Sequence, residues 1–296
     1  MIPGRFASLV ERGGLSADAT RLLEDGYTIV RNAMPSGYMA VMSEELDERF
    51  IDTPFSVGAF HGERTKRFHQ LLSRSSYSHR LVLHQRIMAM VRTVLSPWTD
   101  FPQLNLSQAV EIHPGAPGQI PHRDQAMFPL PKGSVEFSVN VLWPLCTFSE
   151  TNGATQVWPN SHGDEMGHAP ATGQPLVCSM VPGDALVFLG STQHAAGANR
   201  SGLPRRGIIV SYCLGCLNPY ENQALAYSRD FAKTLDPELA AMIGYRWHRP
   251  NLGTFDGQCP SILLNDEVPD HLATVDALIP EHARLVERHR EVQQMA

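Results

Sequence analysis

The chain has 296 residues, of which 43% are hydrophobic and 18% charged, and its formal net charge is −6. A chain of this length can bury a sizeable core as one domain. The mild acidity and the lack of basic clusters exclude the electrostatic pattern of proteins that bind nucleic acid or anionic membranes.

No run of the sequence approaches the roughly 18 consecutive apolar residues that a membrane-spanning helix requires. Residues 1–15 lack a charged head followed by an apolar stretch, so we expect no secretory signal. Five cysteines in a chain this long do not indicate a disulfide framework. These features favour a reducing, cytoplasmic setting.

The first third of the chain is expected to be mostly helical. Ser16 is a good N-cap and Gly26 suits a helix end, which predicts a helix over residues 17–24. The other elements predicted before residue 97 are a strand over 27–30 and helices over 37–50 and 77–95.

After Pro97 the sequence changes to short apolar runs separated by Gly, Pro and Asn. The strands predicted there span residues 104–112, 135–145, 155–158, 176–181, 185–189 and 207–214. Many short strands at regular spacing are typical of a jelly roll of the cupin kind. From residue 222 onward the pattern is helical again, over 224–235 and 280–295.

We therefore expect a mainly β protein with helical extensions that forms a single domain. It divides into a helical N-terminal arm over about residues 1–97, a jelly-roll catalytic core over about 98–217 and a helical C-terminal extension over about 218–296. The extension could act as a lid over the open end of the barrel.

The most informative segment is residues 119–124, Gln-Ile-Pro-His-Arg-Asp. Pro121 biases the residue before it towards extended geometry. In an extended chain residues i and i+2 project from the same face, so His122 and Asp124 can approach one cation together. A second histidine would complete a set of two imidazoles and one carboxylate, which leaves adjacent coordination positions open and is diagnostic of non-haem Fe(II) oxygenases.

The best candidate for that histidine is His194, which follows the apolar run at 185–189. Arg205 stands eleven residues later, after Gly, Asn and Pro residues that suit a turn. His194 and Arg205 are therefore predicted on adjacent strands, about 5 Å apart across the ladder. A five-carbon diacid could bind iron through its 2-oxo acid end and pair its far carboxylate with the guanidinium.

With these residues in place, the sequence resembles the phytanoyl-CoA dioxygenase family of Fe(II)/2-oxoglutarate-dependent oxygenases over about residues 20–215. The segments that carry the likeness are Asp25-Gly26-Tyr27, His122-Arg123-Asp124, Glu150-Thr151-Asn152-Gly153-Ala154-Thr155, Pro159-Asn160-Ser161-His162, Pro182-Gly183-Asp184, and His194 through Arg206. The resemblance implies a double-stranded β-helix, which is a jelly-roll variant. It also implies that iron is held by two histidines and one aspartate, His122, Asp124 and His194.

The same resemblance implies that Arg205 pairs with the carboxylate of 2-oxoglutarate, and that Gln119 and Thr155 hydrogen-bond this co-substrate. Arg206 could replace Arg205 if the turn is one residue longer. Arg67 resembles a polar contact from the helical arm, or else is a solvated charge.

We expect an Fe(II)/2-oxoglutarate-dependent dioxygenase that uses O2 and hydroxylates an unactivated C–H bond of a small, largely apolar metabolite or natural product, releasing succinate and CO2. The partners expected are a small-molecule substrate, with no nucleic acid and no membrane, and we allow for a homodimer. The alternative is a cupin-like divalent-metal protein, an isomerase, hydrolase or sensor, that does not use 2-oxoglutarate. A non-catalytic binding module is a third reading.

Three other features remain open. Cys213 and Cys216 have a zinc or redox spacing but no second pair, so we expect no functional thiol pair. His162 is expected to support a turn rather than bind metal. The polar residues Glu136, Ser138 and Asn140 alternate with apolar ones and either line the site or meet solvent.

Overall fold

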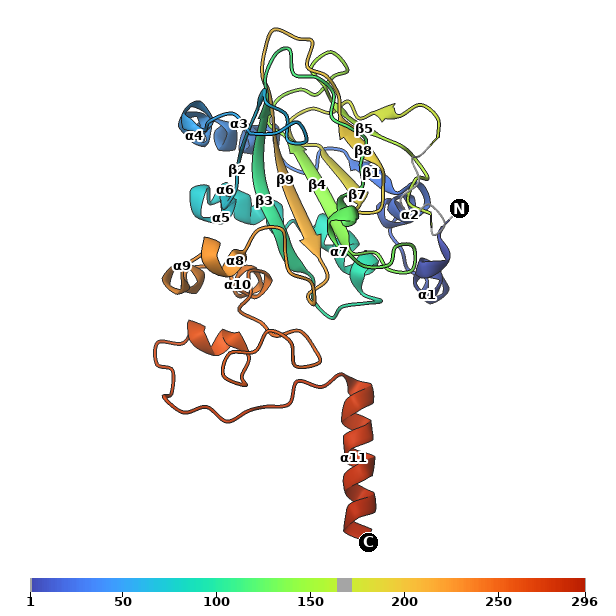
Figure 1. Ribbon diagram of the computed structural model, residues 1–296, viewed down its shortest axis with the longest axis vertical. Helices are drawn as coiled ribbons and strands as arrows, with labels where there is room; N and C mark the ends of the chain where they lie inside the picture. Colours follow the sequence, from blue (N-terminus) through green and yellow to red (C-terminus); the bar gives the residue numbers. More distant parts are fainter. Residues whose placement is uncertain (1, 164–171, 296) are drawn as a thin grey trace.

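The computed structural model describes residues 2–163 and 172–295, and within them the core is built from two antiparallel sheets (Figure 1). The larger sheet has six strands in the order β1-β7-β4-β9-β3-β2, and the smaller has the order β6-β5-β8. The strands are β1 (Tyr27–Val30), β2 (Thr65–Phe68), β3 (Gln103–Ile112), β4 (Ser138–Pro144), β5 (Thr155–Val157), β6 (Leu176–Val177), β7 (Ala185–Leu189), β8 (His194–Ala196) and β9 (Arg205–Cys213). Two facing antiparallel sheets are the arrangement of a jelly roll, as predicted.

The central strands of the larger sheet are buried on both faces. Every residue of β3, β4 and β7 is buried. β7 is apolar throughout, as expected for a strand covered on both faces, whereas β3 and β4 also carry buried polar residues. β3 pairs with β9 from Gln103↔Cys213 to Ile112↔Arg205, with a shift in register between Leu104 and Leu106. Because side chains alternate along a strand, one face of this sheet meets helices and the other meets the smaller sheet.

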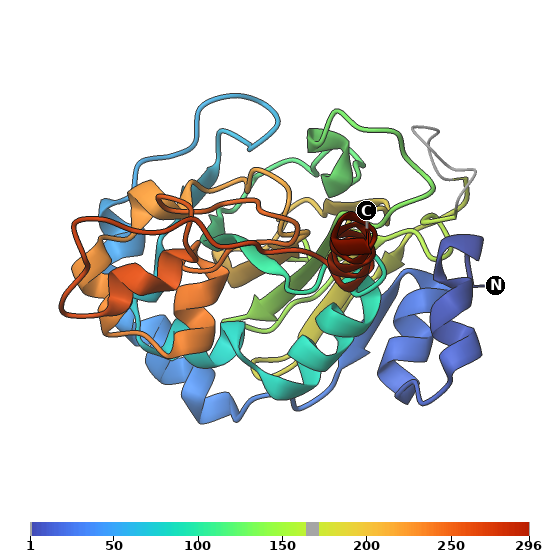
Figure 2. The same cartoon turned by 90° about the horizontal axis from the view of Figure 1, so that it is seen from below.

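Helices cover the first of these faces. The helices of the described chain are α1 (Ala7–Arg12), α2 (Ala17–Asp25), α3 (Ser36–Glu45), α4 (Asp47–Asp52), α5 (Leu71–Arg74), α6 (Tyr77–Val82), α7 (Gln85–Leu95), α8 (Gln223–Ala226), α9 (Arg229–Lys233), α10 (Pro237–Met242) and α11 (Pro280–Met295), with short 3-10 helices η1 (Gly4–Phe6), η2 (Asp124–Met127) and η3 (Pro260–Leu264). Seen from below, most of them gather along one side of the larger sheet (Figure 2).

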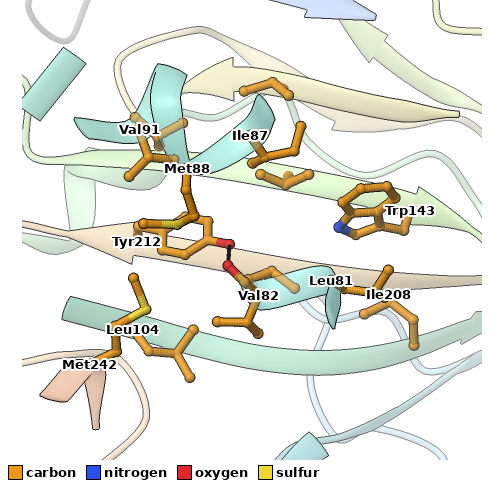
Figure 3. Close-up of a cluster of buried hydrophobic side chains, with 14 of the residues drawn as sticks. Leu81, Val82, Ile87, Met88, Val91, Leu104, Trp143, Ile208, Tyr212 and Met242 are labelled. Carbon is orange, nitrogen blue, oxygen red and sulfur yellow. Dashed lines mark hydrogen bonds between the residues drawn. The ribbon is translucent and has the colours of Figure 1, made fainter. Parts of the chain in front are cut away.

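The main hydrophobic core lies between these helices and the sheet (Figure 3). Side chains of α6 and α7 pack onto Trp143 of β4 and Ile208 and Tyr212 of β9. The Tyr212 hydroxyl donates a 2.7 Å hydrogen bond to the Val82 carbonyl, so the one polar atom of this ring has a partner. With one face filled in this way, only the opposite face of the sheet is left to line a site.

Three of the predicted helices are each divided into two shorter helices in the structure. The helix predicted over 37–50 is interrupted at Leu46, the one over 77–95 at Leu83 and His84, and the one over 224–235 between α8 and α9. At two of the breaks a side chain caps the next helix: His84 accepts from the Ile87 amide and Ser228 from the Phe231 amide. Apolar spacing continues through such breaks, so it does not reveal them.

Both ends of the chain differ in how they join the core. β1 and β2 come from the segment predicted as the N-terminal arm, and they form the two edges of the larger sheet. The Ser16 cap and the left-handed Gly26 at the ends of α2 are as predicted. At the other end, α11 has no buried residue and projects away from the sheets (Figure 1). None of the described helices is long and apolar enough to cross a membrane.

Candidate active site

Two histidines meet where the chain before η2 joins the smaller sheet. The His122 amide donates to the His194 carbonyl (3.0 Å) and the His194 amide donates to the His122 carbonyl (2.9 Å), so the two residues form a β-bridge beside β8. Directly opposed residues of an antiparallel pair project to the same side. Their imidazole rings accordingly lie 4.4 Å apart between centroids.

Asp124 completes the cluster. Arg123 is extended (φ −120°, ψ 127°), so its side chain points away while His122 and Asp124 share a face. Oδ1 of Asp124 lies 3.5 Å from Nε2 of His122, and Oδ2 lies 3.6 Å from Nε2 of His194. One ligand atom from each of the three residues lies within 4.8 Å of the others. This spacing lets the three atoms share one metal ion.

Backbone carbonyls fix both imidazoles. Nδ1 of His122 lies 2.9 Å from the Ile120 carbonyl, and Nδ1 of His194 lies 3.2 Å from the Thr192 carbonyl. A carbonyl can only accept, so each Nδ1 carries a proton. Nε2, which faces Asp124, is therefore the nitrogen that can bind a metal when the imidazole is neutral. This arrangement is usual for histidines that bind a metal through Nε2.

Arg123 ties the two histidine-bearing segments together. Its buried guanidinium donates from Nε to the Ser191 carbonyl (3.0 Å) and from Nη2 to the Ser161 carbonyl (3.0 Å). Ser191 precedes His194 by three residues, and Arg123 itself lies between His122 and Asp124. The side chain that points away from the cluster therefore holds its two halves in register.

The charges around the cluster suit a metal site. Burial lowers the pKa of His194 and outweighs the opposing effect of Asp124, which favours the neutral imidazole that can bind a metal. Burial also acts to lower the pKa of His122, but the hydrogen bond and charge of Asp124 raise it overall. Burial acts to raise the pKa of Asp124, yet His194, His122 and Arg67 together lower it, so this side chain is a carboxylate.

The cluster opens into a cavity of about 340 Å³ between the two sheets. Most of its floor is apolar, formed by Leu106, Val110, Ile112, Leu142, Phe188 and Ile209. Gln119 and Thr155 also line it. The backbone N–H of Gln119 donates to the Ala196 carbonyl (2.9 Å), and Thr155 pairs with Ala196 in the ladder of β5 and β8. The two predicted co-substrate contacts therefore flank the same residue, two positions after His194.

Arg205 lines this cavity as a buried cation. Its Nη1 donates to the Gly153 carbonyl (2.8 Å), and its guanidinium lies 4.4 Å from the centroid of the Phe148 ring. It forms no ion pair with any residue that the structure describes, and its buried Nε has no hydrogen-bond partner there. Burial lowers its pKa to about 10, which still leaves it charged at neutral pH. A buried charge without a counter-ion is costly, so an anion bound in the cavity would stabilise it.

Arg206 faces the other way. It forms ion pairs with Asp47 and Glu111 and lies over the Phe50 ring at 4.5 Å. Successive residues of a strand point to opposite faces, so only one of the two arginines can enter the cavity. The structure places Arg205 there.

The predicted pairing of His194 and Arg205 on adjacent strands is wrong. His194 begins β8 in the smaller sheet, whereas Arg205 begins β9 in the larger one. The chain between them crosses from one sheet to the other, and Asn199 holds this crossing by donating to the Ile112 and Leu203 carbonyls. The Gly and Pro residues that indicate a turn do not show whether the chain returns to the same sheet.

Several polar residues of the cavity were not predicted as site residues: Asn105, Gln108, Ser211 and Tyr220. Of Glu136, Ser138 and Asn140, which were expected either to line the site or to meet solvent, Asn140 lines the cavity, and the other two are buried outside it. Arg67, from β2, also lines the cavity and donates to the Gln108 side chain at 2.8 Å. The polar residues between the apolar residues of β3 could have indicated Asn105 and Gln108. Tyr220 lies in a loop and offered no such signal.

Other polar residues have structural roles. Glu136 forms a buried ion pair with Arg5 (2.9 Å) and accepts from Ser191, while His162 contacts the Leu23 carbonyl at 2.9 Å. Cys213 is buried and Cys216 is exposed, and both are free thiols. None of these residues belongs to the metal-sized cluster found among the described residues.

Comparisons with known proteins agree with this geometry. Residues 22–207 match the family described as Phytanoyl-CoA dioxygenase (PhyH). The dioxygenase trt7 of Aspergillus terreus is 30% identical over 240 residues, which cover 77% of this chain and 83% of that protein. The dioxygenase FrzG of a Cladobotryum species is 33% identical over 207 residues, which cover 64% and 67%.

Two solved structures share the fold. The epimerase SnoN, in complex with Fe3+, alpha ketoglutarate and nogalamycin RO, superposes with a TM-score of 0.56 at 21% identity, covering 71% of this chain and 85% of that one. The alpha ketoglutarate dependent carbocyclase SnoK from nogalamycin biosynthesis gives 0.53 at 16% identity, covering 70% and 93%. The family match spans well over half of the chain. The chain therefore belongs to the phytanoyl-CoA dioxygenase family of iron- and 2-oxoglutarate-dependent oxygenases.

Proposed function

We propose that this enzyme hydroxylates an unactivated C–H bond of a small, largely apolar natural product, with iron held by His122, Asp124 and His194. The reaction consumes 2-oxoglutarate and O2 and releases succinate and CO2. One observation carries the proposal: the three metal-binding side chains and the buried Arg205, which lacks an ion-pair partner among the described residues, open into the same cavity.

The donor set fits ferrous iron. Two imidazoles and one carboxylate on one side of an ion leave adjacent positions for a bidentate 2-oxo acid and for a third ligand. Arg205 then takes the far carboxylate of 2-oxoglutarate, and the Thr155 hydroxyl and the Gln119 amide supply hydrogen bonds along its length. Arg67 adds a second positive charge to the wall next to Asp124.

The chain's own contribution is orientation and the exclusion of water. When bound, iron supplies the oxidation of the substrate at the expense of 2-oxoglutarate and O2. Phe188 packs against His194, with ring centroids 4.5 Å apart, and Phe60 packs against His122 at 5.1 Å. These rings keep solvent from the metal-facing nitrogens and leave an apolar space for the substrate.

The choice of hydroxylation rests on Asp124. By family resemblance, enzymes that halogenate leave the carboxylate position vacant for a halide, whereas here Asp124 fills it. The neighbours SnoN and SnoK are an epimerase and a carbocyclase, so the same scaffold also hosts other oxidative outcomes. A cupin-like metal protein that does not use 2-oxoglutarate would leave the buried charge of Arg205 without an ion-pair partner among the described residues.

The test incubates the iron-loaded enzyme and 2-oxoglutarate with each member of a panel of apolar natural products, and measures succinate formation and the mass of the product. A hydroxylated product gains one oxygen atom, derived from O2. Asp124→Ala is expected to abolish both succinate and product. Iron-dependent turnover by the Asp124→Ala variant would contradict the assignment of Asp124 as a metal ligand. A product without added oxygen would exclude hydroxylation.

A further inference from the structure

A row of polar side chains crosses the otherwise apolar floor of the cavity. Asn140 of β4 lies opposite Ser211 of β9, and Asn105 lies beside Ser211 where the register of β3 shifts. Each of the three is only 1% exposed, and all three line the cavity. Three buried polar residues side by side on an apolar surface cost stability unless their hydrogen bonds are made.

The direction of the hydrogen bonds along this row is fixed by the backbone. The Tyr220 amide donates to Oδ1 of Asn105 (2.8 Å), so the Asn105 oxygen is the acceptor. The Asn105 amide nitrogen therefore donates to Oγ of Ser211, at 3.0 Å. Because Ser211 accepts this bond, its own hydroxyl hydrogen is left to donate, and no hydrogen bond from it to a described residue is formed.

Asn140 ends the row with a second donor. Its Nδ2 is buried and has no partner among the described residues. Opposed residues of an antiparallel pair have Cβ atoms about 5 Å apart, so the Ser211 hydroxyl and the Asn140 amide can reach one ligand atom. Leaving a buried donor unmade costs about 1–3 kcal/mol, and a bound ligand would remove that cost.

The Ser211 hydroxyl and the Asn140 amide lie away from Arg205, the residue proposed to bind the far carboxylate of 2-oxoglutarate. Ser211 and Arg205 are both on β9, six residues apart, and at about 3.3 Å per residue they are separated by about 20 Å along the strand. A five-carbon diacid that pairs with Arg205 is too short to reach the row. The group that meets Ser211 and Asn140 therefore belongs to the substrate.

We propose that Asn140 and Ser211 form a substrate subsite for an uncharged acceptor oxygen, such as the carbonyl of a ketone, ester or lactone on an otherwise apolar skeleton. This inference rests on the proposed function, because it takes the cavity as the substrate site. The row carries no charge, and a carboxylate placed between two neutral donors would lose more hydration than they replace. A neutral carbonyl accepts both hydrogen bonds without that penalty.

The test compares matched ligands that differ by one oxygen. Binding is measured by ligand-observed NMR to the full chain loaded with Zn(II) and 2-oxoglutarate, using trans-2-decalone, camphor and 5α-androstan-3-one, each against its parent hydrocarbon. We expect ketones of the panel to bind roughly tenfold more tightly than their hydrocarbons. Asn140→Leu and Ser211→Ala are expected to reduce this preference to about twofold or less.

Ser107→Ala is the matched control. Ser107 lies on β3 with its side chain on the helical side, where it accepts from the Leu71 amide at 3.1 Å, and it does not line the cavity. This variant makes the same chemical change as Ser211→Ala and is expected to keep the ketone preference. Thermal unfolding checks that each variant is folded. If Asn140→Leu does not fold, the milder substitution Ser211→Ala tests the subsite alone.

Three results would overturn the subsite: no ketone of the panel binds better than its hydrocarbon, the preference survives both substitutions, or both substitutions weaken 2-oxoglutarate rather than the ketone. The proposed function fails separately. A wild-type protein that turns over 2-oxoglutarate but shows no ketone preference would contradict only the subsite. A protein that prefers ketones but does not turn over 2-oxoglutarate would contradict only the proposed oxygenase function.

Discussion

Replacing Arg205 by methionine should separate co-substrate binding from folding. Arg205 is 2% exposed, and its charge has no ion-pair partner among the described residues. Methionine keeps the length and the apolar contact with Phe148 but removes the charge. A buried charge without a partner does not stabilise a fold, so we expect Arg205→Met to unfold at about the same temperature as the wild type or higher.

The loss in 2-oxoglutarate binding should be large. Removing one partner of a buried, hydrogen-bonded charge pair costs about 2–5 kcal/mol, which is roughly 30-fold to several-thousand-fold in Kd. The assay is calorimetric titration of the Zn(II)-loaded protein with 2-oxoglutarate. It reports the co-substrate alone and does not depend on knowing the substrate.

Arg206→Met provides the control in the adjacent residue. Arg206 pairs with Asp47 and Glu111 outside the cavity, and Glu111 is 3% exposed. This variant should therefore lose stability, by about 1–3 kcal/mol, while its affinity for 2-oxoglutarate stays within about threefold, since no bond to the ligand is lost. Unchanged 2-oxoglutarate binding in Arg205→Met, or a large loss in Arg206→Met, would show that the anchor is misassigned.

Three further outcomes follow from the same structure. Gly153→Ala should lower stability by about 1–3 kcal/mol and weaken 2-oxoglutarate binding, because Gly153 has φ +81° and a Cβ there would lie 2.4 Å from the Gly197 carbonyl oxygen; chemical unfolding and calorimetry measure both. Arg123→Met should weaken iron binding about 10- to 100-fold in a metal titration, because the groups that hold the ligand segments are lost. Burial, with Arg67 nearby, lowers the pKa of His69 to about 4, so the unfolded chain binds its proton first as the pH falls from about 6.5, and the free energy of unfolding should fall by up to about 3 kcal/mol down to pH 4.

Each of these three predictions has a control variant or a result that would contradict it. Gly202→Ala, where nothing lies within 4 Å of the added Cβ, should leave stability and 2-oxoglutarate affinity unchanged, and equal effects at both glycines would contradict the steric argument. Iron affinity unaltered in Arg123→Met would mean that its carbonyl contacts do not position the ligands. A His69→Gln variant should lose its share of the acid destabilisation, and an unaltered pH profile would show that His69 is not the titrating group.

Much of the candidate site could be predicted because it depends on local pattern. His122 and Asp124 share a face because the residue between them is extended, which Pro121 and strand periodicity already indicate. The choice between Arg205 and Arg206 could not be made from the sequence, since it depends on the register of β9 against β3. That register is set by nine residue pairs across the sheet rather than by the turn.

The fold shows the same division between local and distant information. The apolar strand Ala185–Leu189 was predicted to the residue. The strand predicted over 135–145 begins three residues later, at Ser138, and the one predicted over 176–181 is only Leu176–Val177. β2, with the sequence Thr-Lys-Arg-Phe, and the three-residue β8 were not predicted. Short or charged strands are held by their partners rather than by their own preferences. None of the described residues after Tyr220 lines the cavity, so a lid formed by the C-terminal extension stays a prediction without a supporting contact.

The most direct test of the account is an anaerobic titration of the protein with Fe(II) and 2-oxoglutarate, followed by visible spectroscopy. We expect one iron per chain and a new absorption band that needs both components, and we expect Asp124→Ala to lose the band and to bind iron at least tenfold more weakly. A wild-type protein that binds no iron, or an Asp124→Ala variant that forms the same band, would contradict the assignment of His122, Asp124 and His194 as the metal site.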